Sequence, residues 1–225
     1  MRWCACLGLA KADSPLAVDV LMHHRELSRP SSTGHLIERS VIGARCHLWR
    51  SERGLEVKDV NADGREVWVL HPAGRPMPEA AEPQSVRIVL LDGSWNEAGK
   101  LARATVGWGR RVSLPMSGES RFWLRSQQEG GRFSTAETLL FLYRAFGLER
   151  AWQSLNLAFE LHVYASLRSR GRKELARLFL EHSVLRLEHA AVREEFEARR
   201  GEDGRFASDR AMADLPVLPG ERGPV

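Results

Sequence analysis

Short apolar runs alternate with longer periodic segments along the first two thirds of the chain. Runs rich in aliphatic and β-branched residues, mostly flanked by turn formers, lie at residues 17–22, 66–70 and 86–91. Such runs are typical of buried strands in a sheet that is covered on both faces. Apolar residues recur at helical spacing over residues 33–42, 94–104 and 134–146. This order predicts an α/β fold with a mostly parallel sheet and flanking helices.

The pattern changes after residue 147. From residue 148 onward it is wholly helical and predicts two or three C-terminal helices, whereas the chain beyond residue 198 is charged and then rich in Pro and Gly. We therefore expect an α/β domain over residues 1–147, a helical extension packed on it over residues 148–198, and a flexible tail over residues 199–225. Four prolines in residues 72–83 predict a surface connection, and Asn-Ala-Asp-Gly at residues 61–64 predicts a hairpin turn.

Composition narrows the class of protein. The 225 residues are 43% hydrophobic and 28% charged with a formal net charge of +4, which excludes a chain that is disordered throughout. The sequence contains no apolar run of the roughly 20 residues that a membrane span needs, and its start lacks the apolar region of a signal peptide, so the cytoplasm is the expected location. Three cysteines are too few for a disulfide framework.

Each predicted strand runs into a polar group or a tight turn: His23-His24, His71-Pro72 and Asp92-Gly93-Ser94. Ligands of parallel sheets bind beyond the carboxyl ends of the strands, so we place the site at that edge. Asp92 is a candidate functional carboxylate because aspartate is poor strand material, although it could also be a turn former before Gly93.

Two segments at this edge, Ser94 to Glu97 and Ser134 to Glu137, fit the S-x-x-E capping box. Two readings are open. The segments are helix starts only, or the two helix N-termini converge on an anionic group such as a carboxylate or phosphate.

Residues 98–132 are basic, with seven Lys and Arg against two Glu, and Trp108, Phe122 and Trp123 are interleaved with them. Arginines contact phosphates and exposed aromatic rings stack on bases, so the segment predicts binding of unpaired RNA. The alternative is a solvated face with aromatic residues in the core. Cys4 and Cys6 are candidate metal ligands with Cys46, but a second closely spaced pair is missing, and we predict no metal site.

At this point the residues resemble the DTW-domain proteins, a family named for an Asp-x-Thr-Trp motif. Four blocks in the family's order carry the resemblance, over roughly residues 4–147: His23-His24-Arg25-Glu26 followed by Ser32-Thr33-Gly34; the strand into His71-Pro72; residues 91–100, which begin Leu-Asp-Gly-Ser-Trp; and Ser134-Thr135-Ala136-Glu137. Ser94 stands in place of the motif threonine and keeps its hydroxyl, His24 stands where proline is usual, and only Cys4 and Cys6 remain of an N-terminal cysteine cluster.

The resemblance implies transfer of the 3-amino-3-carboxypropyl group of S-adenosylmethionine to N3 of a uridine in tRNA, on a fold related to the knotted SPOUT methyltransferases. It makes residues 1–147 the catalytic domain and Asp92 the general base that removes the proton from N3. We expect the cofactor to contact Pro72, Asp92, Gly93, Ser94, Trp95, Leu114, Pro115, Ser134, Thr135 and Glu137. We expect tRNA to contact Lys100, Arg103, Arg110, Arg111, Arg121 and Arg125.

Two other functions stay open at this point. The same fold and cofactor could transfer a methyl group to RNA, or the chain could be an RNA-binding module without catalysis. The sequence predicts no membrane partner and does not determine the oligomeric state, for which a monomer is favoured.

Overall fold

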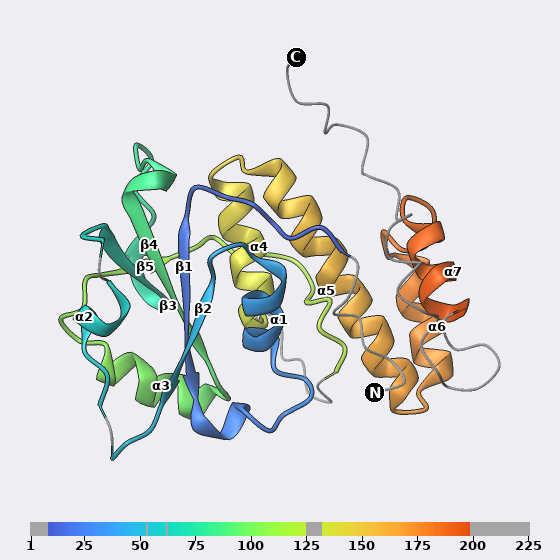
Figure 1. Ribbon diagram of the computed structural model, residues 1–225, viewed down its shortest axis with the longest axis horizontal. Coiled ribbons are helices and arrows are strands. Elements are labelled where there is room, and N and C mark those ends of the chain that lie inside the picture. Colours follow the sequence, from blue (N-terminus) through green and yellow to red (C-terminus); the bar gives the residue numbers. More distant parts are fainter. Residues whose placement is uncertain (1–8, 53, 62, 125–131, 199–225) are drawn as a thin grey trace.

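The structure is a computed structural model, and it describes residues 9–52, 54–61, 63–124 and 132–198. Five parallel strands form one sheet with the order β2-β1-β4-β3-β5 (Figure 1). The strands are β1 (Ala17–His23), β2 (Arg45–Trp49), β3 (Glu66–Pro76), β4 (Val86–Asp92) and β5 (Arg110–Ser113). The predicted α/β fold with a parallel sheet is therefore confirmed, and all carboxyl ends of the strands meet at one edge.

Seven α-helices are present in the part of the chain that the structure describes. They are α1 (Thr33–Ser40), α2 (Val57–Val60), α3 (Trp95–Ala104), α4 (Thr135–Ala145), α5 (Glu149–Ser169), α6 (Lys173–Glu181) and α7 (Ala190–Ala198). The predicted helices near the sheet and the predicted C-terminal helices are confirmed. Short 3₁₀ helices follow β1 at His24–Glu26 and precede β4 at Pro83–Ser85. None of the helices in the described ranges is both long enough and apolar enough to cross a membrane.

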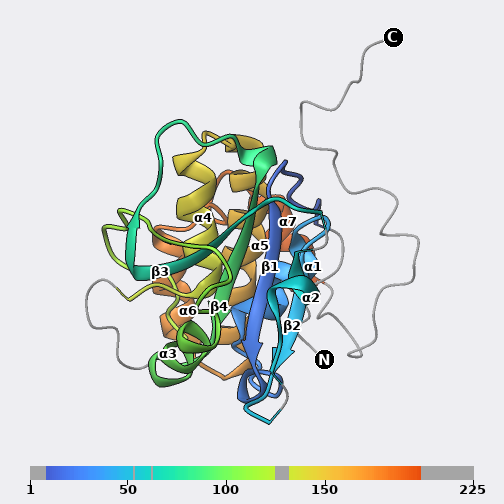
Figure 2. The same ribbon diagram turned by 90° about the vertical axis from the view of Figure 1, so that its left-hand side faces the viewer.

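Helices cover both faces of the sheet. Successive side chains of a strand point to opposite faces, and because these strands are apolar at consecutive positions, each face presents apolar side chains to a layer of helices. On β3, Trp68 and Leu70 join a large apolar cluster with α1, α4 and α5, whereas Val67 and Val69 join a smaller cluster with Val60 of α2 and Leu101 of α3. Figures 1 and 2 show the same arrangement, with α2 and α3 on one side of the sheet and α1, α4 and α5 on the other. A two-sided core explains why these strands are apolar at consecutive positions.

Two local predictions are wrong. The turn at residues 61–64 does not form a hairpin, because it leads into β3 and the neighbours of β3 are β4 and β5, both parallel to it. The surface connection predicted over residues 72–83 begins too early, since β3 continues to Pro76 after a shift of register between Leu70 and Arg75 against β5. The shift falls at the polar end of the strand, where Pro72 and Ala73 are exposed.

The edge strand β2 was not predicted. It has the sequence Arg-Cys-His-Leu-Trp, and none of its residues is fully buried. An edge strand that pairs only with β1 needs no continuous apolar run, so its hydrophobic pattern is too weak to mark it.

Candidate functional site

A cavity of about 360 Å³ opens at the carboxyl ends of β4 and β5 and beside residues 70–72 of β3, where its apolar run ends. Apolar side chains form most of its wall, and the hydroxyl-bearing residues Ser134, Thr135 and Thr138 of the α4 N-terminal region add polar groups. Its volume lies within the range of roughly 300–1,000 Å³ that is typical of small-molecule sites. The cavity is therefore large enough for a nucleoside-sized ligand with one apolar and one polar side.

Six of the predicted cofactor contacts line this cavity: Pro72, Gly93, Trp95, Leu114, Ser134 and Thr135. They come from β3, from the loop after β4, from the start of α3, from the end of β5 and from the start of α4. The other four, which do not line it, are Asp92, Ser94, Pro115 and Glu137. The fold thus brings together residues that lie more than 60 positions apart in the sequence, from Pro72 to Thr135.

Asp92 lies directly behind the cavity wall and is 2% exposed. Its two carboxylate oxygens accept hydrogen bonds from Ser32 Oγ at 2.9 Å and from Thr135 Oγ1 at 2.6 Å. A Cβ built on Gly34 would come within 2.6 Å of Asp92 Oδ2, so only glycine leaves room for the carboxylate there. Two hydroxyl groups and the nearby backbone of Gly34 therefore hold the carboxylate in one orientation. Both sequence neighbours of Asp92, Leu91 and Gly93, line the cavity.

Both S-x-x-E segments form complete capping boxes, at the starts of α3 and α4. The boxes use the N–H groups of the serine and the glutamate in each segment, and Thr33 Oγ1 accepts from the N–H of Ala136 at 3.3 Å. The first-turn N–H groups that remain outside these bonds are those of Trp95, Asn96 and Thr135, and of these three residues Trp95 and Thr135 line the cavity. The two interpretations of these segments are thus compatible, but an anion in the cavity would meet the N–H groups of two lining residues rather than a full set from each helix.

The glutamates of the two boxes have further partners. Glu97 is buried, pairs with Arg29 at 3.1 Å and lies 3.8 Å from His23 Nδ1. Burial opposes its ionisation, but hydrogen bonds from Ser94 and the charge of Arg29 outweigh burial and lower the pKa of Glu97 to about 2. Glu97 is therefore an anion at neutral pH and connects the start of α3 to the segment after β1.

Glu137 ties the start of α4 to the segment after β5. Its carboxylate accepts from Ser120 Oγ at 2.9 Å and from the N–H of Arg121 at 2.7 Å, in addition to the N–H of Ser134 at 2.7 Å. The protein itself thus supplies several partners for this carboxylate. We infer that Glu137 positions the cavity wall rather than contacting a ligand directly.

His71 lines the cavity, although sequence reasoning assigned the site to its neighbour Pro72. The Nδ1 atom of His71 accepts from the N–H of Ala73 at 3.1 Å. Burial and then the charge of Arg111 lower the pKa of His71, so its imidazole is neutral at pH 7. With Nδ1 acting as acceptor, the proton sits on Nε2, and His71 can donate one hydrogen bond. In the sequence, the signal for His71 was its position directly after the apolar run at residues 66–70.

The predicted RNA contacts fall into two groups: cations that are exposed on the surface, and arginines whose guanidinium groups bond to other parts of the protein. Lys100 and Arg103 are exposed on α3, and the exposed Arg110 pairs with Glu66 at 3.0 Å. Arg111 donates to the backbone oxygen of Ala102. Arg121 forms a two-point ion pair with Glu160 of α5, at 2.9 and 2.7 Å, so its guanidinium is bound within the protein.

The interleaved aromatic residues do not form a stacking surface. Phe122 is 2% exposed, Trp123 meets Phe179 edge to face, and Trp108 packs on the smaller apolar cluster. These rings belong to the core, as expected from the alternative interpretation of this segment, a solvated face with aromatic residues in the core. The exposed ring at the site is Trp95, which is 50% exposed, lines the cavity and has the guanidinium of Arg132 at 5.3 Å from its centre.

Three residues named from the sequence cannot be placed. Arg125, Cys4 and Cys6 lie outside the described residues.

Taken together, the fold and the site define an α/β protein with a cavity at the carboxyl edge of an all-parallel sheet. Residues of two capped helix starts line this cavity, and a buried aspartate is hydrogen-bonded to one of them. Residues 1–167 match the model of the DTW domain, which is about three quarters of the chain, and the chain belongs to this family. No solved structure matches the chain. The match ends within α5, two residues before its last residue, Ser169.

Proposed function

We propose that the protein transfers the 3-amino-3-carboxypropyl group of S-adenosylmethionine to N3 of a uridine in tRNA. Membership of the DTW family supports an enzyme of this kind. The observation that carries the proposal is the contact between the two motif blocks: Thr135, from the second capping box, donates to Asp92, 43 residues earlier, at the wall of the cavity. Residues 91–100, which carry the DTW-type motif, and the second capping box therefore meet at the wall of the same cavity.

The cavity fits the cofactor in size and in chemistry. Its apolar wall suits an adenine ring, and the N–H groups of the lining residues Trp95 and Thr135 suit a carboxylate or ribose oxygens. When bound, S-adenosylmethionine supplies an activated carbon next to its sulfonium, with methylthioadenosine as the leaving group. We propose that Pro72, Gly93, Ser94, Leu114, Pro115 and Ser134 help to shape this pocket, with Glu137 behind it.

Asp92 is proposed as the general base. N3 of uridine is a weak nucleophile while it carries a proton, and a carboxylate that is shielded from water can remove that proton. A carboxylate offers about four lone-pair sites, so Asp92 can accept a proton in addition to its bonds with Ser32 and Thr135. In the motif, Ser94 replaces threonine, and its hydroxyl does accept from the N–H of Glu97, so the substitution keeps the cap.

The finer features expected from the resemblance belong to the same proposal. We propose a SPOUT-related knot, which depends on the path between β5 and α4 and so includes residues 125–131, outside the described ranges. We also propose that residues 1–147 form the catalytic domain with residues 148–198 as an extension, and that the protein acts as a monomer in the cytoplasm.

The reaction product tests the function. The purified chain is incubated with S-adenosylmethionine and an unmodified tRNA transcript, and both the small molecules and the digested nucleosides are analysed by mass spectrometry. We expect methylthioadenosine and a uridine that has gained the aminocarboxypropyl group. Adenosylhomocysteine with a methylated nucleoside would identify a methyltransferase instead. RNA binding with neither product would identify a binding module.

Exposed cations of α3 and β5 should carry RNA binding. We expect the triple variant Lys100→Gln, Arg103→Gln and Arg110→Gln to bind tRNA more weakly and with a flatter salt dependence. Each lost phosphate contact lowers the slope of log K against log salt by roughly 0.7 on single strands or 0.9 on a duplex. Arg121 is left unchanged in this variant because its partner Glu160 is buried.

The matched control removes three exposed cations at α6 and beyond it, as Arg172→Gln, Lys173→Gln and Arg186→Gln. Both variants have the same net charge. A difference between their salt slopes therefore shows that the location of the lost cations, and not the overall charge, determines tRNA binding. Equal slopes in the two variants would show that the residues around α3 are an ordinary solvated face.

A further inference from the structure

Three side chains with different ligand atoms gather on the side of the sheet opposite α3, between α1 and the edge strand β2. They are His35 and Glu38 of α1 and Cys46 of β2, and their ligand atoms all lie within 4.8 Å of one another. His35 and Glu38 are one helical turn apart, so they share a face of α1, with His35 Nδ1 at 4.0 Å from Glu38 Oε2. Figure 1 shows α1 beside β2. None of these residues takes part in the proposed reaction.

We propose that His35, Glu38 and Cys46 bind a Zn²⁺ ion, or a similar divalent transition metal, that ties α1 to the edge of the sheet. Imidazole and thiolate ligands favour zinc and cobalt, whereas Mg²⁺ and Ca²⁺ prefer sites made of oxygen atoms. Three protein ligands leave one position of a tetrahedral site for water. This inference does not depend on the proposed function.

The present geometry is close to that of a bound site. Metal–ligand distances of 2.0–2.3 Å place the ligand atoms of a tetrahedral zinc site roughly 3.3–3.7 Å apart, so small side-chain rotations are sufficient. The side chains of Glu38 and His35 are 43% and 28% exposed, and the Glu38 carboxylate is already drawn to Cys46, whose backbone N–H donates to Glu38 Oε1 at 3.1 Å. Cys46 is the fixed member, because β2 holds its backbone and its thiol donates to the carbonyl oxygen of Gly34 at 3.5 Å.

The surroundings of Cys46 are anionic. Burial and then the negative charges of Glu38, Asp92 and Asp19 raise the pKa of the Cys46 thiol, which is therefore protonated when no cation is present. The same charges attract a cation. When the metal binds, the sulfur–hydrogen bond is replaced by a sulfur–metal bond and the proton passes to solvent, so the apparent affinity should fall as the pH falls.

The site would act on the proposed active site through α1. The first turn of α1 contains Gly34, whose backbone lies against Asp92, and Ser32 immediately before the helix donates to the same carboxylate. A metal that fixes α1 against β2 would hold these groups in place. Its expected role is thus structural, and its presence should raise the thermal stability of the protein.

Cobalt provides a direct readout of the cysteine ligand. The full chain, freed of metal with a chelator, is titrated with CoCl₂ while the thiolate-to-cobalt charge-transfer absorption is recorded. We expect this band to appear with one ion per chain and to disappear in Cys46→Ser. His35→Gln and Glu38→Gln should weaken binding by about tenfold or more. The exposed His182→Gln serves as the histidine control and should bind like the unchanged chain.

The double variant Cys4→Ser, Cys6→Ser separates this site from the N-terminal cysteines. We expect it to keep the band and the rise in Tm with ZnCl₂. The proposal fails if the unchanged chain shows no thiolate band, or if the band survives Cys46→Ser and is lost in the double variant. Thermal unfolding of metal-free Cys46→Ser, followed by circular dichroism, establishes that this variant is folded.

Discussion

Asp92→Asn is expected to lower the turnover of aminocarboxypropyl transfer by roughly 10²–10⁴, the range typical of general-base loss. Asparagine keeps the shape of the side chain but cannot take up the proton of uridine N3. Its amide can still accept from one of the hydroxyl groups of Ser32 and Thr135 and can donate to the other, so the site should keep its geometry. Binding of tRNA and of S-adenosylmethionine should therefore change little.

The measurement is the rate of methylthioadenosine release at saturating tRNA, compared with Asp13→Asn at an exposed position. Because hydroxide can replace the missing base, the rate of Asp92→Asn should recover as the pH rises. Turnover close to that of the unchanged protein at neutral pH would remove Asp92 from the base role and leave it as a turn former.

Thr135→Val distinguishes two ways in which Asp92 can act. Thr135 lines the cavity, whereas Asp92 lies behind it and accepts from the Thr135 hydroxyl at 2.6 Å. If Asp92 takes the proton directly, loss of this hydroxyl should cost far less turnover than Asp92→Asn. An equal loss in both variants would show that the proton passes through Thr135, which would make Asp92 a positioning residue.

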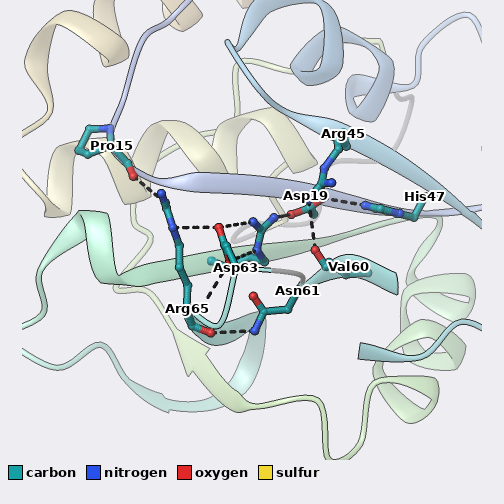
Figure 3. Close-up of polar contacts among 9 residues, drawn as sticks. Pro15, Asp19, Arg45, His47, Val60, Asn61, Asp63 and Arg65 are labelled. Atoms are coloured by element: carbon teal, nitrogen blue, oxygen red, sulfur yellow. Dashed lines mark hydrogen bonds and ion pairs between the residues drawn. The ribbon is translucent and has the colours of Figure 1, made fainter. Parts of the chain in front are cut away.

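Asp19→Asn is expected to lower the free energy of unfolding by about 3–5 kcal/mol without a direct effect on the reaction. Asp19 is fully buried on β1 and is the common partner of two arginines and one histidine from β2 and β4 (Figure 3). They are Arg87, Arg45 at 3.2 Å and His47 at 2.7 Å. Loss of the carboxylate leaves Arg87, whose side chain is 7% exposed, with Asp63 as its remaining acidic partner among these contacts.

Thermal unfolding measures this effect, and a Tm lower by roughly 6–20 °C is expected for a chain of this size. Asp63→Asn is the matched control. Asp63 contacts Arg87 at 2.7 Å in the same network, but its side chain is 40% exposed, so its loss should cost about 1 kcal/mol or less. A Tm in Asp19→Asn equal to that of the control would show that the buried charges make no net contribution.

A double variant shows whether the cost arises from the unpaired charge. Asp19→Leu combined with Arg87→Met replaces the central ion pair by apolar side chains of similar size. Such replacements are often neutral or stabilising, so the double variant should be more stable than Asp19→Asn. Arg45 and His47, which are 50% and 16% exposed at their side chains, can turn toward water.

The local features of the fold could be predicted from the sequence. The buried strands at residues 17–22, 66–70 and 86–91 were evident because a sheet covered on both faces requires apolar residues at consecutive positions. The helix starts at Ser94 and Ser134 were evident because a capping box is made within four residues. Position of the site at the carboxyl edge followed from the parallel order of the elements, and the cavity does lie there.

Only the tertiary structure decided which side chains meet. Asp92 obtains its partners from Ser32, 60 residues earlier, and from Thr135, 43 residues later, and no periodicity carries such a pairing. Arg121 belongs to a basic segment in the sequence, yet its guanidinium pairs with Glu160 of α5. This pair forms because α5 packs against α4 and so comes close to the segment before α4. The edge strand β2, which brings Cys46 to His35 and Glu38, has no apolar run to mark it. Backbone propensity and burial act over a few residues and leave a pattern in the sequence, whereas contacts between elements depend on how their surfaces pack, which no local pattern records.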